Sequence, residues 1–297
     1  MKLRSVELAL PGAKQAAEFI CAQWGGKLAA QINSTYYVRG TGSFPYLVAF
    51  SERAHKCVES VTFVATEDEI GAIKLRAADA GVAYANVQCE DLGGGEGIVL
   101  SGPDGEVLRF IANAETVEEL DDIDLPRQLT HVVFNATDAE RSADFVESIL
   151  NFRVSDRTKG MVFVRCNNAH HSTAFARAGF ASLNHIAFEM IDLDAVMRGI
   201  GRMRDQGFSP SWGPGRHGPG DNAFAYYIAP FGAVIEFSTA VEHVDDDYIP
   251  GEPADWTWPE GRIDQWGISD KDFVGLNAAE QTFTFDLSLY NELLRRS

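Results

Sequence analysis

The chain contains two copies of the same strand-like strings, about 126 residues apart, and the copies differ in chemistry at matched positions. LTHVVF places His131 where LRSVEL has Ser5, and LNHIAF places His185 where VESVTF has Ser60. A repeat of this length predicts a duplicated fold whose halves share one backbone plan. Because only the second copy offers imidazoles at these positions, we expect the two halves to differ in function.

A third matched position separates the halves further. GAVIEF carries Glu236 where GEVLRF carries Arg109. The carboxylate stands between Ile235 and Phe237, an apolar setting that predicts burial. A buried carboxylate is costly unless a cation neutralises it. The pattern therefore favours a metal ion bound by the second half only.

The repeat also has a finer grain of about 55 residues, in which a strand leads into an amphipathic helix and then into short strands. Gly and Lys or Arg near the helix ends support this division. The segments that repeat the plan are predicted strands at 3–10 and 129–134 and predicted helices at 16–26, 68–81, 140–151 and 193–207. The sequence thus predicts an α+β fold of two domains, each built from two βαβββ modules.

The composition along the chain suggests where the domains end. We expect an N-terminal domain without metal at 1–114, an acidic linker at 115–127 and a catalytic domain at 128–245. The remaining tail, 246–297, contains three tryptophans and three prolines. So many aromatic residues do not suit disorder, and we expect the tail to pack on the catalytic domain or on a neighbouring subunit.

Charge and hydropathy exclude several classes of partner. The formal net charge of −18 argues against a nucleic-acid partner, which needs clustered Lys and Arg. No apolar run reaches the length of a membrane span, and the first residues lack a signal-peptide pattern. The four cysteines show no CxxC spacing and are expected to be free thiols. We expect a cytoplasmic protein that forms a homo-oligomer and binds no membrane.

His131, His185 and Glu236 lie at equivalent places in their modules, so the fold can bring them together. A lone histidine on an apolar strand is more often a hydrogen-bonded core residue, and that interpretation stays open for each imidazole alone. Together, two imidazoles and one carboxylate form a ligand set that leaves adjacent coordination positions open. Such a triad suits non-haem Fe(II) oxygen chemistry.

Two further segments have residues suited to a polar reaction pocket. NNAHHSTAF places His170 and His171 upstream of His185, and a Gly- and Pro-rich loop places His217 and Tyr226 upstream of Glu236. The simpler alternative is a surface loop with a solvated His217 and a strand aromatic at Tyr226. The gathering of histidines around the proposed triad favours a role in the site.

On these residues the chain resembles the type I extradiol ring-cleaving dioxygenases of the vicinal oxygen chelate superfamily, which includes catechol and dihydroxybiphenyl dioxygenases. The family has a histidine fifteen residues before its second metal ligand, which matches His170. It also has a histidine followed nine residues later by a tyrosine, which matches His217 and Tyr226. Its metal glutamate follows that histidine by nineteen residues, which matches Glu236.

The resemblance implies the vicinal oxygen chelate, or glyoxalase-like, fold and an Fe(II) cofactor, with Mn(II) as an alternative that uses the same ligands. It implies the metal ligands already named. It implies that His170 handles a proton beside oxygen and that His217 and Tyr226 hydrogen-bond the substrate. The reaction would open the ring of a catechol with O2 beside one hydroxyl, to a muconic semialdehyde-type product. His171 has no matched role.

Substrate-recognition residues are not part of the motif. Trp212, Trp256 and Phe180 are candidates for an aromatic pocket, with core packing as the alternative. The sequence shows no evident Arg or Lys that would bind a substrate carboxylate, which favours a neutral catechol. Two other functions stay open: a glyoxalase-like lyase or isomerase, and a metal-free binding protein of the bleomycin-resistance type. Ser5, Ser60 and Arg109 speak against a glyoxalase site shared between the two domains.

Overall fold

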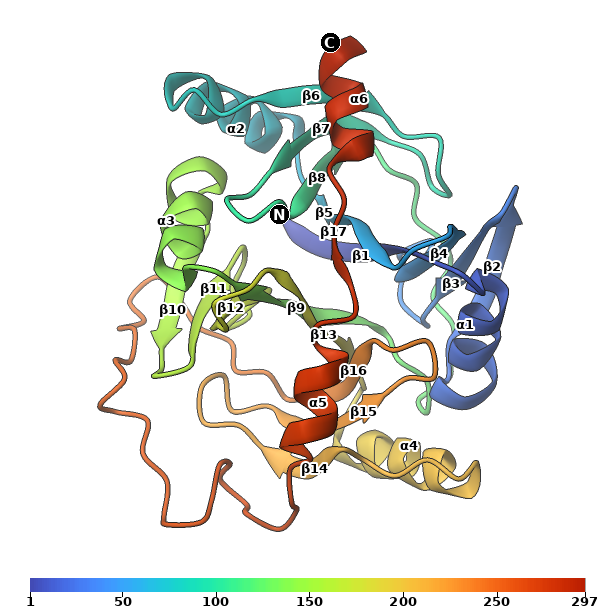
Figure 1. The fold of residues 1–297 in the computed structure, drawn as a ribbon, viewed down its shortest axis with the longest axis vertical. Helices are drawn as coiled ribbons and strands as arrows, with labels where there is room; N and C mark the ends of the chain where they lie inside the picture. The colour runs from blue at the N-terminus through green and yellow to red at the C-terminus, as the bar shows by residue number, and fades with distance from the viewer. Residues whose placement is uncertain (297) are drawn as a thin grey trace.

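The computed structural model, which describes residues 1–296 apart from the side chain of Leu289, contains two mixed β-sheets with helices on their outer faces (Figure 1). The strand order is β2-β3-β4-β1-β5-β8-β7-β6 in the first sheet and β10-β11-β12-β9-β13-β16-β15-β14 in the second. The two orders are the same once the numbering is shifted by eight. The expected α+β fold of two domains with two βαβββ modules each is therefore confirmed.

The first sheet is built from the strands of the first two modules. The first module contains β1 (Lys2–Leu10), α1 (Ala13–Phe19), the π-helical turn η1 (Ile20–Trp24), β2 (Lys27–Ile32), β3 (Thr35–Arg39) and β4 (Val48–Glu52). The second contains β5 (Cys57–Val64), α2 (Glu67–Asp79), β6 (Tyr84–Gln88), β7 (Glu96–Ser101) and β8 (Val107–Ala112). The first strands of the modules, β1 and β5, pair antiparallel at the centre.

The second sheet repeats this arrangement. The third module contains β9 (Gln128–Ala136), α3 (Ala139–Leu150), β10 (Arg153–Arg157), β11 (Met161–Arg165) and β12 (Thr173–Arg177). The fourth contains β13 (Ser182–Glu189), α4 (Leu193–Asp205), β14 (Trp212–Arg216), β15 (Ala223–Ile228) and β16 (Val234–Thr239). Here β9 and β13 pair antiparallel at the centre, while β13 and β16 are parallel.

Side-chain caps begin the helices where the chain leaves a strand. Asp138 and Asp192 accept hydrogen bonds from backbone amides in the first turns of α3 and α4. Thr66 and Glu69 form a capping box at α2. The helix expected at 16–26 begins earlier, at Ala13, and its last turn is a π-helix that ends at a glycine with positive φ.

The π-helical turn connects the two domains. It directs Trp24, which is fully buried, across to the second sheet, where its ring stacks on Phe237 at a centroid distance of 3.6 Å. One continuous hydrophobic core contains residues of both sheets. The domains therefore pack against each other as a rigid pair, because separating them would expose this shared apolar surface.

The tail runs along both sheets (Figure 1). The helix α5 (Phe273–Ala279) contacts β15 of the second sheet, and the short strand β17 (Thr284–Phe285) pairs with β5 of the first. The last helix, α6 (Ser288–Arg296), contacts β6 and β7. The tail thus reaches the first sheet as well as the second, a contact that the sequence did not indicate.

None of the helices in residues 1–296 combines the length and apolar character that a membrane span requires. All four cysteines are free thiols.

Candidate metal centre

The register of the second sheet places the three predicted ligands on one face. His131 of β9 is opposite Ala187 of β13, and Ala187 is opposite Glu236 of β16. Paired residues on neighbouring strands point to the same side of a sheet. His185 precedes Ala187 by two residues and therefore points to that side as well. The small side chain of Ala187 leaves space between the three polar groups.

The three side chains converge on one point. The Nε2 atoms of His131 and His185 lie 3.1 Å and 3.2 Å from Oε2 of Glu236, and 3.3 Å from each other. Adjacent ligands of an octahedral ion with bonds of about 2.1 Å lie about 3.0 Å apart. The observed spacings are close to that value, so these residues fit a divalent ion bound on one face and open on the other.

The charge state of the triad also suits a cation. Burial opposes ionisation of Glu236, but the neighbouring His131 and His185 more than offset it, and the pKa of Glu236 is held well below its usual range. Burial lowers the pKa of His185, although Glu236 acts in the opposite direction. The site therefore offers one carboxylate and neutral imidazole, the forms in which these groups bind metals.

Hydrogen bonds behind the triad hold its side chains in place. Nδ1 of His185 lies 2.6 Å from Oδ1 of Asn184, and the Asn184 amide in turn donates to Asn135. Asn222 donates to the second carboxylate oxygen of Glu236 at 3.2 Å. A carbonyl acceptor on Nδ1 leaves Nε2 of His185 free for a metal. The sequence did not indicate these supporting residues, because each is an asparagine with no distinctive spacing.

His217 and Tyr226 meet beside the triad. Nε2 of His217 lies 3.0 Å from the Tyr226 hydroxyl, which lies 3.5 Å from Nε2 of His185. Tyr226 is opposite Glu236 in the sheet, so it shares the face of the ligands. Burial lowers the pKa of His217 to about 3, and burial followed by the charge of Glu236 raises the pKa of Tyr226 well above its usual range. Both groups are neutral hydrogen-bonding partners.

The two adjacent histidines differ from the expectation. His170 was expected beside the metal, but its Nε2 lies 2.8 Å from Oδ2 of Asp156 and it does not line the cavity at the triad. His171 lines that cavity, and its ring centroid lies 4.3 Å from that of His131. A count made across the loop between β12 and β13 does not fix which of the two faces the site.

His170 and His171 are nevertheless connected. Their Nδ1 atoms lie 3.0 Å apart, so the hydrogen-bonded order is Asp156, His170, His171. Oδ1 of Asp156 accepts from the Tyr248 hydroxyl and from the backbone amide of Gly251, both in the tail. All three members of the chain are buried.

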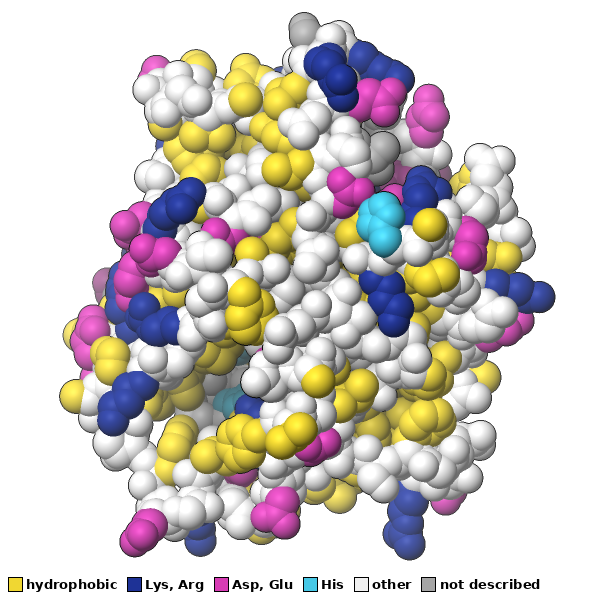
Figure 2. Space-filling model, viewed as in Figure 1, with side chains coloured by type: hydrophobic (Ala, Val, Ile, Leu, Met, Phe, Trp, Pro, Cys, Tyr) yellow, Lys and Arg dark blue, Asp and Glu magenta, His cyan; other side chains and the backbone are white. Residues whose placement is uncertain are grey.

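A cavity of about 770 Å³ opens from the triad to the surface. Figure 2 shows this face of the molecule hollowed, with a histidine side chain visible inside. Of the aromatic residues considered from the sequence, Trp212 and Trp256 line the cavity, and Phe180 does not. Much of the remaining wall comes from the tail, of which the sequence indicated only Trp256. The other tail residues with large side chains in the wall are Trp258, Glu260, Arg262, Ile263, Lys271, Leu276 and Glu280.

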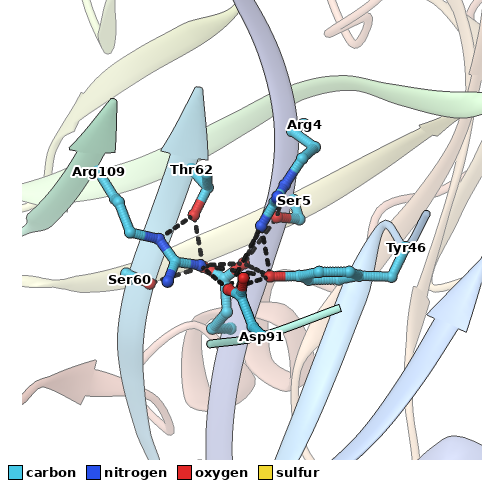
Figure 3. A network of polar contacts seen from close by, with 8 residues as sticks. Arg4, Ser5, Tyr46, Ser60, Thr62, Asp91 and Arg109 are labelled. Carbon is cyan, nitrogen blue, oxygen red and sulfur yellow. Dashed lines mark hydrogen bonds and ion pairs between the residues drawn. The ribbon is translucent and has the colours of Figure 1, made fainter. Parts of the chain in front are cut away.

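The equivalent place in the first sheet holds a network of side chains (Figure 3). Ser5, Thr62 and Arg109 occupy the positions of His131, Ala187 and Glu236. Their common partner is a carboxylate with no counterpart among the ligands. Glu7 accepts hydrogen bonds from the hydroxyls of Ser5, Tyr46, Ser60 and Thr62 and lies 3.2 Å from the Arg109 guanidinium.

The guanidinium groups of Arg109 and the buried Arg4 supply the positive charge of this network, and Arg4 lies 3.8 Å from Glu7 and 3.5 Å from Asp91. Arg109 also lies 2.6 Å from Asp91. Burial opposes ionisation of Glu7, but the charges of Arg109 and Arg4 outweigh it and lower the pKa of Glu7. The position where the second sheet would hold a cation is therefore filled by a side chain of the protein.

A further group of possible ligands lies at the tail. It consists of His55, Cys57 and Asp286. His55 is exposed, and burial, followed by the charge of Asp286, raises the pKa of the Cys57 thiol to about 12. Because metals bind the thiolate, this raised pKa opposes binding there.

Comparisons with known proteins agree with this geometry. Residues 128–237 match the family model of the Glyoxalase/Bleomycin resistance protein/Dioxygenase superfamily. The sequence is 33% identical to Metapyrocatechase 2 of Cupriavidus necator over 152 residues, which is 48% of this chain. The chain spans about half the length of this curated relative, with 45% of it matched.

Two solved structures resemble nearly the whole chain. The Mn(II)-bound glyoxalase from Novosphingobium aromaticivorans superposes with a TM-score of 0.84 at 27% identity, covering 92% of this chain and 93% of that one. Homoprotocatechuate 2,3-dioxygenase from Arthrobacter globiformis superposes with a TM-score of 0.84 at 19% identity, covering 97% and 93%. Residues 128–237 therefore resemble the glyoxalase, bleomycin-resistance and dioxygenase superfamily, and the chain has the two-domain fold seen in the Arthrobacter globiformis dioxygenase.

Proposed function

We propose that the protein is an Fe(II)-dependent extradiol dioxygenase that cleaves the ring of a catechol with O2, beside one hydroxyl. The observation that carries this proposal is the triad of His131, His185 and Glu236, open toward a cavity wide enough for an aromatic ring. The name of the Cupriavidus necator relative and the fold of the Arthrobacter globiformis dioxygenase support it. The proposed catalytic domain is 128–245.

The triad would hold the ferrous ion through two neutral imidazoles and one carboxylate. When bound, the metal supplies adjacent open positions and redox chemistry for the reaction of a diol with dioxygen. The protein surrounds those positions with His171, His217 and Tyr226. Tyr226 and His217, neutral and hydrogen-bonded to each other, would orient a substrate hydroxyl and exclude water from it.

The hydrogen-bonded chain behind His171 determines how that ring is protonated. An ionised carboxylate only accepts, so His170 donates to Asp156 through Nε2 and is left with an accepting Nδ1. His171 then donates through its own Nδ1, which leaves its Nε2 unprotonated. We assign to this nitrogen the acceptance of a proton from a catechol hydroxyl, whereas the family resemblance gave His170 the handling of a proton beside oxygen.

The test is an anaerobic reconstitution followed by an oxygen-electrode assay. The metal-depleted protein is loaded with Fe(II) or Mn(II) and mixed with a panel of catechols, while oxygen uptake and the absorbance of a yellow semialdehyde product are recorded. His131→Ala, His185→Ala and Glu236→Ala should each lose the metal and keep the fold by circular dichroism. Ser5→Ala, at the matched position of the first sheet, should keep the metal. Metal-loaded protein that consumes no oxygen with any catechol would refute the proposal.

A glyoxalase-like lyase or isomerase is the second candidate. It is favoured by the similarity to the Mn(II)-bound glyoxalase, whose identity to this chain is higher than that of the superposed dioxygenase. Against it, the first sheet presents Arg109 where a shared site would need a ligand. Turnover of a thiol adduct of an α-ketoaldehyde without oxygen uptake would favour this candidate. A metal-free binding protein of the bleomycin-resistance type would show neither metal binding nor turnover.

We also propose a cytoplasmic location and a homo-oligomeric state. Cell fractionation tests the first, and size-exclusion chromatography with light scattering tests the second.

A further inference from the structure

A half-buried cation of the cavity wall has no ion-pair partner among the described residues. Lys271, from the tail, lines the cavity together with His185, Trp212 and His217. The other Lys and Arg residues of the described wall, Lys159 and Arg262, are exposed, whereas Lys271 is half-buried. Within residues 1–296, no carboxylate oxygen lies within 4.0 Å of its Nζ.

Two aromatic rings hold the ammonium group in place. Nζ lies 4.2 Å from the ring centroid of Trp212 and 5.4 Å from that of Phe273. Cation–π contacts stabilise an ammonium group but leave its positive charge unneutralised. Glu280, elsewhere in the wall, raises the pKa of Lys271, but burial acts more strongly and lowers it. An anion placed here would therefore relieve a desolvated charge.

The sheet register gives the direction from the triad to this cation. Along one face, Glu236 is opposite Tyr226, and Tyr226 is opposite Trp212. The Trp212 ring stacks on Tyr226 at 5.3 Å and an interplanar angle of 17°. Two strand spacings separate Glu236 from Trp212, about 10 Å. A diol bound at the triad would thus extend over Tyr226 toward Trp212 and Lys271.

We propose that Lys271 is a specificity-determining residue that pairs with a carboxylate carried by the catechol ring, so that the substrate class is anionic catechols. This inference rests on the proposed function and differs from the neutral catechol that the sequence favoured. The sequence did not indicate it, because Lys271 lies 35 residues beyond the last ligand, in a segment without a motif.

The experiment compares anaerobic binding of matched ligand pairs to the metal-loaded protein. The pairs are dihydroxybenzoate and dihydroxyphenylacetate, each with its neutral amide, and Kd is measured by titration. The wild type should bind the acid of at least one pair more tightly than the amide. Lys271→Met should weaken binding of that acid by roughly 10- to 100-fold, as expected for loss of a hydrogen bond to a charged group, and leave the amide unchanged.

Two variants separate recognition from folding. Lys271→Arg should restore most of the preference for the acid, because it keeps the charge and the aromatic contacts. Lys159→Met, at the exposed rim, should leave the Kd of both the acid and the amide unchanged. Equal weakening of acid and amide in Lys271→Met would show a structural role and overturn the inference, as would a wild type without preference. If the wild type binds none of the four ligands, the proposed function itself fails, and this inference fails with it.

Discussion

At the scale of single residues, the site depends on which nitrogen of each histidine carries a proton. Asp156 orders His170, and His170 orders His171, through contacts of 2.8 Å and 3.0 Å. Burial, followed by the charges of neighbouring histidines, lowers the pKa of His171 well below its usual value. The ring that faces the cavity is therefore neutral, with one ring nitrogen unprotonated.

His171→Phe should keep the metal and bind catechol anaerobically, yet turn over about 10²- to 10⁴-fold more slowly, because general base catalysis is lost. His170→Phe leaves the cavity-facing ring of His171 in place and should lower kcat by roughly tenfold or less. Metal analysis, anaerobic titration and kcat check the three properties separately. A larger loss of kcat in His170→Phe than in His171→Phe would reverse our assignment.

A second residue-scale feature lies far from the site, in the turn between β7 and β8. Glu106 is buried, and Oε2 accepts a hydrogen bond from the Asp104 amide at 3.0 Å. Its Oε1 has no partner among the described residues. Burial raises the pKa of Glu106 to about 7.

This shift predicts a pH dependence of stability. The folded state holds a proton on Glu106 that the unfolded state releases near pH 4.5, so the free energy of unfolding should fall as pH rises from about 4.5 to 7. Glu106→Gln cannot ionise and should be more stable than the wild type at pH 8 by about 1–3 kcal/mol. At pH 5 the two should differ little. Urea unfolding at both pH values measures this, and an equal difference at each pH would exclude ionisation as the cause.

At the scale of elements, the two sheets use the same three strand positions in different ways. In the second sheet, β9, β13 and β16 present ligands to a cavity, and in the first sheet β1, β5 and β8 present a closed network around Glu7. Arg109, together with Arg4, supplies from within the chain the positive charge that the second sheet would take from an ion. The first sheet thereby gains stability and loses a metal site.

Arg109→Met should lower the free energy of unfolding by about 3 kcal/mol, because Glu7 and Asp91 would lose their nearer cation and keep only the more distant Arg4. This loss of stability should shrink as pH falls. The pKa of Glu7 is lowered in the folded state, so its ion pair stabilises the fold near neutral pH and ceases to do so in acid. Denaturant unfolding at pH 7 and pH 4 measures both effects. Lys14→Met removes an exposed pair with Glu18 and should cost under about 0.5 kcal/mol. Metal content should stay at about one ion per chain, and an unchanged stability would contradict this account of the network.

At the scale of the whole molecule, the tail and the shared core join the two domains into one unit. The tail closes the cavity, supports Asp156 and then pairs with the first sheet. Tyr290 of its last helix and Leu287, just before that helix, pack on β6, β7 and β8, and Tyr290 donates to the carbonyl of Ala83 at 2.8 Å.

Two truncations should therefore differ in kind. Ending the chain at residue 285 removes α6 and should lower the stability of the first sheet while metal content and turnover persist. Ending it at residue 245 also removes the walls of the cavity and the partners of Asp156, and turnover should be lost. Thermal unfolding, metal analysis and oxygen uptake distinguish the two cases. Full turnover in the shorter chain would show that the tail is not part of the site.

Local patterns were enough to predict much of this architecture. Alternating and helical periodicities placed the strand at 129–134 and the helix at 193–207 within a few residues, because each depends on one face of burial. The repeat of about 126 residues identified His131, His185 and Glu236 as one group, since equivalent positions in a duplicated fold share a face of the sheet.

Only the tertiary structure decided the features that depend on contacts between distant segments. A residue count across a loop favoured His170, whereas the fold places His171 in the cavity wall, because Asp156, supported by the tail, holds His170 behind it. Lys271 entered the cavity wall through the path of the tail, which no local period encodes. The sequence by itself determined which strands carry the ligands, and the packing of the tail and loops determined what surrounds them, because burial and hydrogen bonding there depend on residues far apart in the chain.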